Sequence, residues 1–253
     1  MAIALSSITK SVRNRLPPRV VVHGPHGVGK STLGASAYNP VFLPLEDGLS
    51  GLEVDAFPLL TSYPQVREAL QVLRTSEHAF GTVVVDSLDW LEPLIQAETC
   101  ARNKWTNIEA PGYGKGYAEA ANDWREFLDL CNALRTERGM AVVLIAHSEI
   151  KRFEAPDTEA FERYQIKLQR SAAALVQEWA DVIGFAQFET AIKKEAVGMN
   201  QRARGIATGR RLLHVTEKPA YVAKNRYGMA DTLELSWSAL IAAMNPPAAA
   251  QAA

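Results

Sequence analysis

The sequence lacks most features that would place it in a specialised class. It holds two cysteines, Cys100 and Cys131, among 253 residues, and neither belongs to a CxxC or Cys/His pattern. This argues against a disulfide framework and a cysteine-based metal site, so we expect both to be reduced packing residues. The formal net charge of -1 excludes a global field toward nucleic acid or membrane, so DNA contact would need a local basic patch.

Long apolar runs are also missing. No stretch approaches the roughly 20 residues that a membrane-spanning helix needs. Residues 1–10 have no basic segment and only a very short apolar run, unlike a signal peptide. We therefore expect no membrane contact and a cytoplasmic location.

What is present suits one α/β domain. Hydrophobic residues make up 47% of the chain and charged residues 22%, which is ordinary for a globular domain with a sizeable core. We expect a single domain over residues 1–245, followed by a low-complexity, disordered tail at 246–253.

Short apolar runs alternate with helix-like segments through roughly the first 150 residues, which predicts a mostly parallel sheet flanked by helices. Pro44 predicts an edge position or a local irregularity for its strand. The polar residues 151–164 predict a loop, and later runs with short connections predict antiparallel strands at the C-terminal edge. The first four predicted strands are 20–22, 41–45, 82–86 and 140–146.

A glycine-rich segment after the first predicted strand matches the pattern GxxxxGK[ST] in full, and a predicted helix follows it. Glycines let the backbone wrap closely around phosphates, and backbone N–H groups supply positive partial charge. We predict a P-loop that binds ATP, in which Lys30 reaches the β- and γ-phosphates and Ser31 binds Mg²⁺. The segment consists of Gly24, Pro25, His26, Gly27, Val28, Gly29, Lys30 and Ser31, followed by Thr32.

Two acids follow predicted strands. Asp86 ends the run 82–86, and a P-loop site needs an acid at the end of a neighbouring strand to hold Mg²⁺. A helix N-cap is the alternative reading of Asp86. Glu46 is a candidate for orienting the water that attacks the γ-phosphate. Asp47 competes for that role, and a polar loop pair is the alternative.

His147 follows the apolar run 140–146. A polar side chain there can hydrogen-bond the γ-phosphate, although a structural histidine is the alternative. Asp89 is interpreted as a surface residue or a first-turn helix residue.

Positive charge gathers in the last third of the sequence. Between residues 193 and 211, six basic residues stand against one acid, Glu195, which gives +5 in a chain of net charge -1. This stretch is a candidate for following a phosphate backbone, with a solvated hairpin as the alternative. The six residues are Lys193, Lys194, Arg202, Arg204, Arg210 and Arg211.

Lys224 and Arg226 lie one residue apart after the last predicted strand. Such a pair can project into a neighbouring subunit's site, where an arginine finger neutralises transition-state charge. A basic turn is the alternative.

Taken in order, these residues resemble the RecA-type ATPases, most closely the phage single-strand-annealing subgroup of RecA-like recombinases (the Sak-four type). The resemblance also includes Gly112-Tyr113-Gly114 and the stretch from Tyr164 to Phe185, and it covers nearly the whole chain. It rests on the loop 24–32, Glu46, Asp86-Ser87, His147 and Lys224-Asn225-Arg226.

The resemblance implies a RecA-like core that hydrolyses ATP. Glu46 would be the catalytic carboxylate, His147 would replace the γ-phosphate-sensing glutamine, and Lys224 and Arg226 would act in trans. The loops 104–117 and 150–164 would face an axis along which single-stranded DNA runs.

The implied activity is annealing in DNA recombination, by a homo-oligomeric ring or filament helped by a single-strand-binding protein. A phage protein of this kind works in the bacterial host cytoplasm. RecA's separate N- and C-terminal domains have no room in this sequence, which favours annealing over strand invasion.

Two other functions fit parts of the sequence. A RecA-fold ATP-dependent switch or assembly protein without DNA binding suits the near-neutral charge. A P-loop phosphotransferase would need an arginine-rich lid and an acceptor pocket, and the sequence shows no clear lid.

Overall fold

A computed structural model describes residues 16–156, 158–197 and 200–245 of the chain; the predicted tail at 246–253 lies outside them. The helices are α1 (Lys30–Ala35), α2 (Tyr63–Thr75), α3 (Leu88–Asn103), α4 (Lys115–Glu137), α5 (Arg170–Trp179) and α6 (Trp237–Met244). The strands are β1 (Arg19–Gly24), β2 (Pro40–Pro44), β3 (Asp55–Ala56), β4 (Thr82–Asp86), β5 (Ala141–Ala155), β6 (Thr158–Ile166), β7 (Val182–Val197), β8 (Asn200–His214), β9 (Lys224–Asn225) and β10 (Thr232–Glu234).

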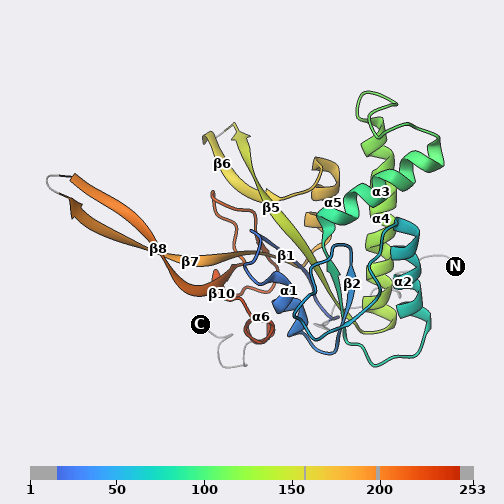
Figure 1. Cartoon of the computed structure of the whole chain (residues 1–253), viewed down its shortest axis with the longest axis horizontal. Helices are drawn as coiled ribbons and strands as arrows, with labels where there is room; N and C mark the ends of the chain where they lie inside the picture. The colour runs from blue at the N-terminus through green and yellow to red at the C-terminus, as the bar shows by residue number, and fades with distance from the viewer. Residues whose placement is uncertain (1–15, 157, 198–199, 246–253) are drawn as a thin grey trace, which may run out of the picture.

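The strands join in one mixed sheet (Figure 1). Its order is β10-β8-β7-β1-β5-β4-β2-β3, with β6 paired to β5 and β9 paired to β7. From β7 to β3 the neighbours pair in parallel, whereas β8, β10, β9 and β6 pair antiparallel. The predicted α/β class, with a mostly parallel sheet and antiparallel strands at its C-terminal edge, is confirmed.

Helices cover both faces of the parallel strands. Successive side chains of β1 point to opposite faces, so Val21 belongs to one apolar cluster and Val20 and Val22 to another. Helices α2 to α5 supply the first cluster, while α1 and α6 pack against the second. Burial on both faces explains why these strands are continuous apolar runs rather than alternating ones. Within the described ranges, no helix has the length and apolar character needed to cross a lipid bilayer.

Strand β5 lies between β1 and β4, which corrects one detail of the sequence interpretation. The sequence interpretation puts Asp86 at the end of a strand that neighbours the P-loop strand. In the structure, β5 separates its strand β4 from β1. The parallel register sets Gly24 opposite His147 and Ile145 opposite Asp86. The carboxyl ends of β1 and β4 therefore lie at the same edge of the parallel sheet, and His147, within the longer strand β5, lies between the loop and the acid.

Pro44 ends β2, which is an inner strand. Its outer neighbour β3 pairs only with Val41 and Phe42, so Pro44 has no ladder partner on that side. Asp86 faces it on the other side, and the Pro44 carbonyl accepts the N–H of Leu60 at 2.9 Å. A proline fits here because no strand requires its missing N–H.

Residues 151–164 are not a loop, which corrects a second expectation. They form most of a β5–β6 hairpin in which Phe153 faces Phe161. The two rings lie 5.2 Å apart, and the Arg163 guanidinium lies 4.0 Å from the centre of the Phe153 ring. These cross-strand contacts stabilise strands whose composition is otherwise polar.

Strands β7 and β8 continue beyond the body of the sheet as a two-stranded arm (Figure 1, left). We call residues 189–197 and 200–210 the β7–β8 arm. The pairing register shifts between Phe188 and Thr190, where the arm begins. Arg211 pairs with Phe188 just inside that shift, so it lies at the base of the arm.

His23, on β1, is fully buried next to the carboxyl end of that strand. Its Nε2 lies 2.8 Å from the Val222 carbonyl and its Nδ1 lies 2.9 Å from Ser148 Oγ. Because a carbonyl only accepts, Nε2–H donates to Val222 and Nδ1 accepts from Ser148. Burial lowers the pKa of His23 to about 4, so the ring is neutral at neutral pH.

This buried imidazole predicts a pH-dependent stability. Between pH 6.5 and about 4 the unfolded chain protonates His23 while the folded chain does not, so stability falls as the pH falls. The shift corresponds to about 3 kcal/mol over that range. His23→Gln keeps a donor and an acceptor, so its free energy of urea unfolding, measured between pH 7 and 4, should depend less on pH. Equal pH dependence in both proteins would contradict the assignment.

Candidate nucleotide-binding site

The glycine-rich segment 24–32 connects β1 to α1 in a conformation that needs glycine at two points. A Cβ on Gly24 would collide with the Ala186 carbonyl of β7. Gly29, immediately before α1, has φ +103°, which a residue with a side chain rarely adopts. The segment thereby packs closely on the sheet and turns its backbone toward the space above it.

The Lys30 side chain lies within this turn. Its Nζ donates to the carbonyls of Gly24 at 3.1 Å and Pro25 at 2.9 Å. Burial lowers the pKa of Lys30, and the charges of nearby acids, Asp86 foremost, partly offset that effect. The ammonium group is therefore held at the loop and faces a cluster of carboxylates.

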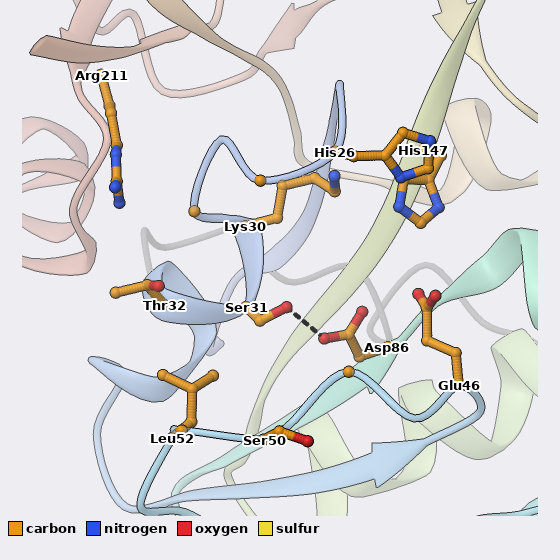
Figure 2. A pocket seen from close by; sticks show the side chains of 14 residues that line it. His26, Lys30, Ser31, Thr32, Glu46, Ser50, Leu52, Asp86, His147 and Arg211 are labelled. Atoms are coloured by element: carbon orange, nitrogen blue, oxygen red, sulfur yellow. Dashed lines mark hydrogen bonds between the residues drawn. The ribbon is translucent and has the colours of Figure 1, made fainter. Parts of the chain in front are cut away.

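Ser31 and Asp86 meet in front of the loop (Figure 2). Ser31 Oγ donates to Asp86 Oδ2 at 2.6 Å. Burial raises the pKa of Asp86, and the neighbouring Glu46 charge adds to that effect. Glu46, after β2, accepts a hydrogen bond from Ser87 Oγ at 2.8 Å. The two predicted acids are thus brought together by the adjacent strands β2 and β4.

A cavity of about 390 Å³ opens at this edge and joins the predicted residues. Glu46, Asp86 and His147 line it, whereas the competing Asp47 is exposed and lies outside the lining. Val28 also lies outside, because its side chain is buried in the core. From the segment 24–32, the lining residues are His26, Gly27, Gly29, Lys30, Ser31 and Thr32.

Asp89 is a site residue that sequence reasoning missed. Its Oδ2 accepts from His147 Nδ1 at 2.8 Å and its Oδ1 accepts from the His147 backbone N–H at 2.9 Å. Its side chain is only 4% exposed, which corrects the surface interpretation. Burial raises the pKa of Asp89, but the His147 hydrogen bonds outweigh it and lower the pKa to about 2. Its place in the first turn of α3, the other reading that the sequence analysis gives, is confirmed.

His147 also contacts the glycine-rich segment. Its ring centre lies 4.2 Å from that of His26 (Figure 2). Because ionised Asp89 can only accept, Nδ1 of His147 carries a hydrogen, which leaves Nε2 for another partner. His147 is therefore held between α3 and the loop, on the same side of the cavity as Glu46.

Arg211 is placed differently from its expected role. Sequence analysis groups it with the DNA-binding candidates, yet its side chain lines the nucleotide cavity beside Gly29 (Figure 2). Arg210 is exposed and pairs with Glu189 at 3.4 Å. The backbones of the other four basic candidates, Lys193, Lys194, Arg202 and Arg204, lie in the β7–β8 arm.

Lys224 and Arg226 lie far from the cavity of their own chain. They follow or belong to β9, which pairs with Val182 and Ile183 at the start of β7, whereas the cavity lies at the other end of the parallel strands. Lys224 Nζ donates to two carbonyls at the end of α5, at 2.7 and 3.0 Å. Arg226 pairs with Asp181 at 3.2 Å.

Comparison with known families identifies the chain. The profile of a family described as an AAA domain matches residues 16–227, which is most of the chain. The chain belongs to this family of P-loop ATPases. No curated protein matches it. The matched range contains the glycine-rich segment, both acids and His147, the residues around the cavity described above.

The geometry predicts that nucleotide affinity depends on Lys30 and not on Glu46. Lys30→Ala should weaken ATP and ADP binding by about a hundredfold, because a charge-assisted contact to phosphate is lost. Glu46→Gln should bind both nucleotides like the wild type, since Glu46 lies on the acid side of the cavity. Isothermal titration calorimetry measures the affinity of each variant for ATP and for ADP. The control is Lys218→Ala, a substitution at an exposed residue. Unchanged affinity in Lys30→Ala would overturn the site.

Proposed function

We propose that this AAA domain hydrolyses ATP with Mg²⁺, binds single-stranded DNA through the β7–β8 arm and promotes strand annealing as a homo-oligomer. The observation that carries the hydrolysis is the convergence of Lys30, Ser31, Asp86 and Glu46 on one cavity. Phosphoryl transfer needs a phosphate-binding cation, oxygen ligands for a metal and an acid near the attacking water. All three are supplied by side chains within this cavity.

The oxygen donors suit Mg²⁺. Ser31 Oγ and Asp86 Oδ2 already lie 2.6 Å apart, and a hydroxyl and a carboxylate are hard ligands of the kind Mg²⁺ prefers. Ser31 and Asp86 would hold the ion. When bound, Mg²⁺ neutralises charge on the phosphates.

Glu46 is suited to act on the attacking water. Its Oε1 is occupied by Ser87 at 2.8 Å, which orients the carboxylate and leaves Oε2 to accept from a water. The water oxygen bonds to the γ-phosphorus while the bond to the β–γ bridging oxygen breaks. The proton passes to Glu46, and Lys30 stabilises charge on the phosphate oxygens, giving ADP and inorganic phosphate.

His147 supports a role in sensing the terminal phosphate. Since Asp89 accepts from Nδ1, His147 can donate to a phosphate oxygen through Nε2 only as the imidazolium. Through its neighbour Ser148, the start of the β5–β6 hairpin, a change at His147 can reach the hairpin.

DNA binding is supported by charge and shape. The β7–β8 arm and its base carry the six basic residues that sequence analysis singles out, and five remain candidates once Arg211 is assigned to the cavity. The arm extends away from the body of the sheet, where a nucleic acid strand has room to lie along it (Figure 1). A single-strand-binding protein is the proposed partner that delivers such strands.

An assembly in which Lys224 and Arg226 act in trans is supported by their position. They lie at the end of the sheet opposite the cavity, and the Arg226 side chain is 49% exposed. A neighbouring copy stacked against that end could receive the guanidinium in its cavity, where it would neutralise transition-state charge.

A switch protein without DNA binding is the second candidate. The observation that favours it is that Lys224 and Arg226 are already bound by α5 and Asp181, which explains them without a partner. Product analysis distinguishes a phosphotransferase from the proposed ATPase. The ATPase, incubated with ATP alone, should yield only ADP and inorganic phosphate.

DNA binding by the arm predicts a characteristic salt dependence. Lys193 and Arg204 pair directly across the two strands of the arm and so belong to one face. For single strands, log Kd changes with log salt by about 0.7 per neutralised phosphate, so Lys193→Ala combined with Arg204→Ala should reduce the slope by about 1.4. The measurement is fluorescence anisotropy of a labelled oligonucleotide across salt concentrations, with ATP analogue. Lys218→Ala is the control. A wild type without salt-sensitive binding would favour the switch protein.

The trans arrangement predicts rescue between inactive variants. Arg226→Ala should keep ATP affinity but lose most phosphate release, whereas Lys30→Ala loses both. In mixtures, an Arg226 from the Lys30→Ala subunit can serve the intact cavity of an Arg226→Ala subunit, so activity should return in part. Phosphate release is measured at several mixing ratios. Absence of rescue at every ratio would exclude the trans role.

A further inference from the structure

Arg211 is a cation that the hydrolysis scheme leaves unused. It belongs to β8 and faces Phe188 of β7 in the pairing register. Its backbone carbonyl accepts the N–H of Leu235 at 3.0 Å, which fixes the strand beneath it. Its side chain is exposed, and within the described ranges no carboxylate forms an ion pair with its guanidinium. An exposed guanidinium with no acid partner at a phosphate cavity is a ready anion contact.

The position of Arg211 beside the loop is close. A Cβ built on Gly29 would lie 2.7 Å from a terminal nitrogen of Arg211, so the guanidinium lies directly against the loop at Gly29. The guanidinium carbon lies 5.9 Å from the centre of the Phe188 ring, which supports the side chain from its other side. Arg210, the preceding residue, points to the opposite face of the strand and pairs with Glu189.

The two ends of the cavity differ. Glu46, Asp86 and His147 gather on one side of Lys30, and Arg211 lies on the other, toward Thr32 (Figure 2). The acids mark where water attacks the terminal phosphate. A cation on the opposite side of Lys30 therefore meets the phosphates that remain after hydrolysis.

We propose that Arg211 binds the non-terminal phosphates of ATP and ADP within its own subunit and thereby connects bound nucleotide to the base of the β7–β8 arm. The inference rests on the proposed nucleotide function. Arg211 lies just inside the register shift at which the arm leaves the sheet, so a phosphate held by its guanidinium restrains that junction. The contact is made in cis, in contrast to the trans role proposed for Arg226.

The test is nucleotide binding by variants at Arg211. Arg211→Ala should weaken the binding of ADP and of a non-hydrolysable ATP analogue by the same factor, about tenfold to a hundredfold. Inorganic tripolyphosphate should compete less well against labelled ADP by a similar factor. Arg211→Lys keeps the charge without the planar fork and should be intermediate. Arg125→Ala, an exposed arginine on α4, is the control, and circular dichroism verifies that each variant is folded.

A second readout concerns the arm. Amide hydrogen exchange at residues 186–188 and 211–213 should slow when ADP binds the wild type, and this protection should be lost in Arg211→Ala at saturating ADP. A wild type that binds no nucleotide defeats the proposed function itself. A wild type that binds, with an Arg211→Ala variant of equal affinity for ADP and tripolyphosphate, overturns the assignment of Arg211 alone. Weaker binding of the ATP analogue with unchanged binding of ADP would also overturn it.

Discussion

The parallel register of β1, β5 and β4 is the constraint on which the site depends. It sets Gly24 beside His147 and brings Asp86 one strand further along the same edge. Gly24 and Asp86 end buried strands and His147 lies within β5, so apolar packing on both faces of the sheet fixes their positions. A shift of one residue in any strand would turn these side chains toward the other face. The packing that stabilises the core therefore also sets the geometry of the cavity.

Much of the fold could be predicted from the sequence. The runs at 20–22 and 82–86 are buried, β-branched and bounded by turn residues, so local pattern sufficed. The β5–β6 hairpin was missed although it is local in sequence, because its composition is mostly polar and its cross-strand contacts, such as Phe153 with Phe161, form only when the strands pair in register. The insertion of β5 between β1 and β4 is likewise a property of strand order, which periodicity does not encode.

The candidate site was also predictable from the sequence only in part. Lys30, Ser31, Asp86 and Glu46 lie in motifs whose spacing reflects their chemistry, and the structure brings them to one cavity. The burial of Asp89 and the direction of the Arg211 side chain were not predicted, because their surroundings come from other elements: Asp89 accepts hydrogen bonds from His147 of β5, and Arg211 turns toward the loop after β1. A basic residue in a charged stretch gives no signal of which face of its strand it occupies.

The two carbonyl contacts of Lys30 have a thermodynamic consequence. An ammonium group bonded to Gly24 and Pro25 has already replaced part of its hydration shell with protein oxygens. A phosphate that recruits it exchanges one set of polar contacts for another, so the gain is the difference between two satisfied arrangements rather than the full strength of a new ion pair. The same two carbonyls remain available to the ammonium when no phosphate recruits it.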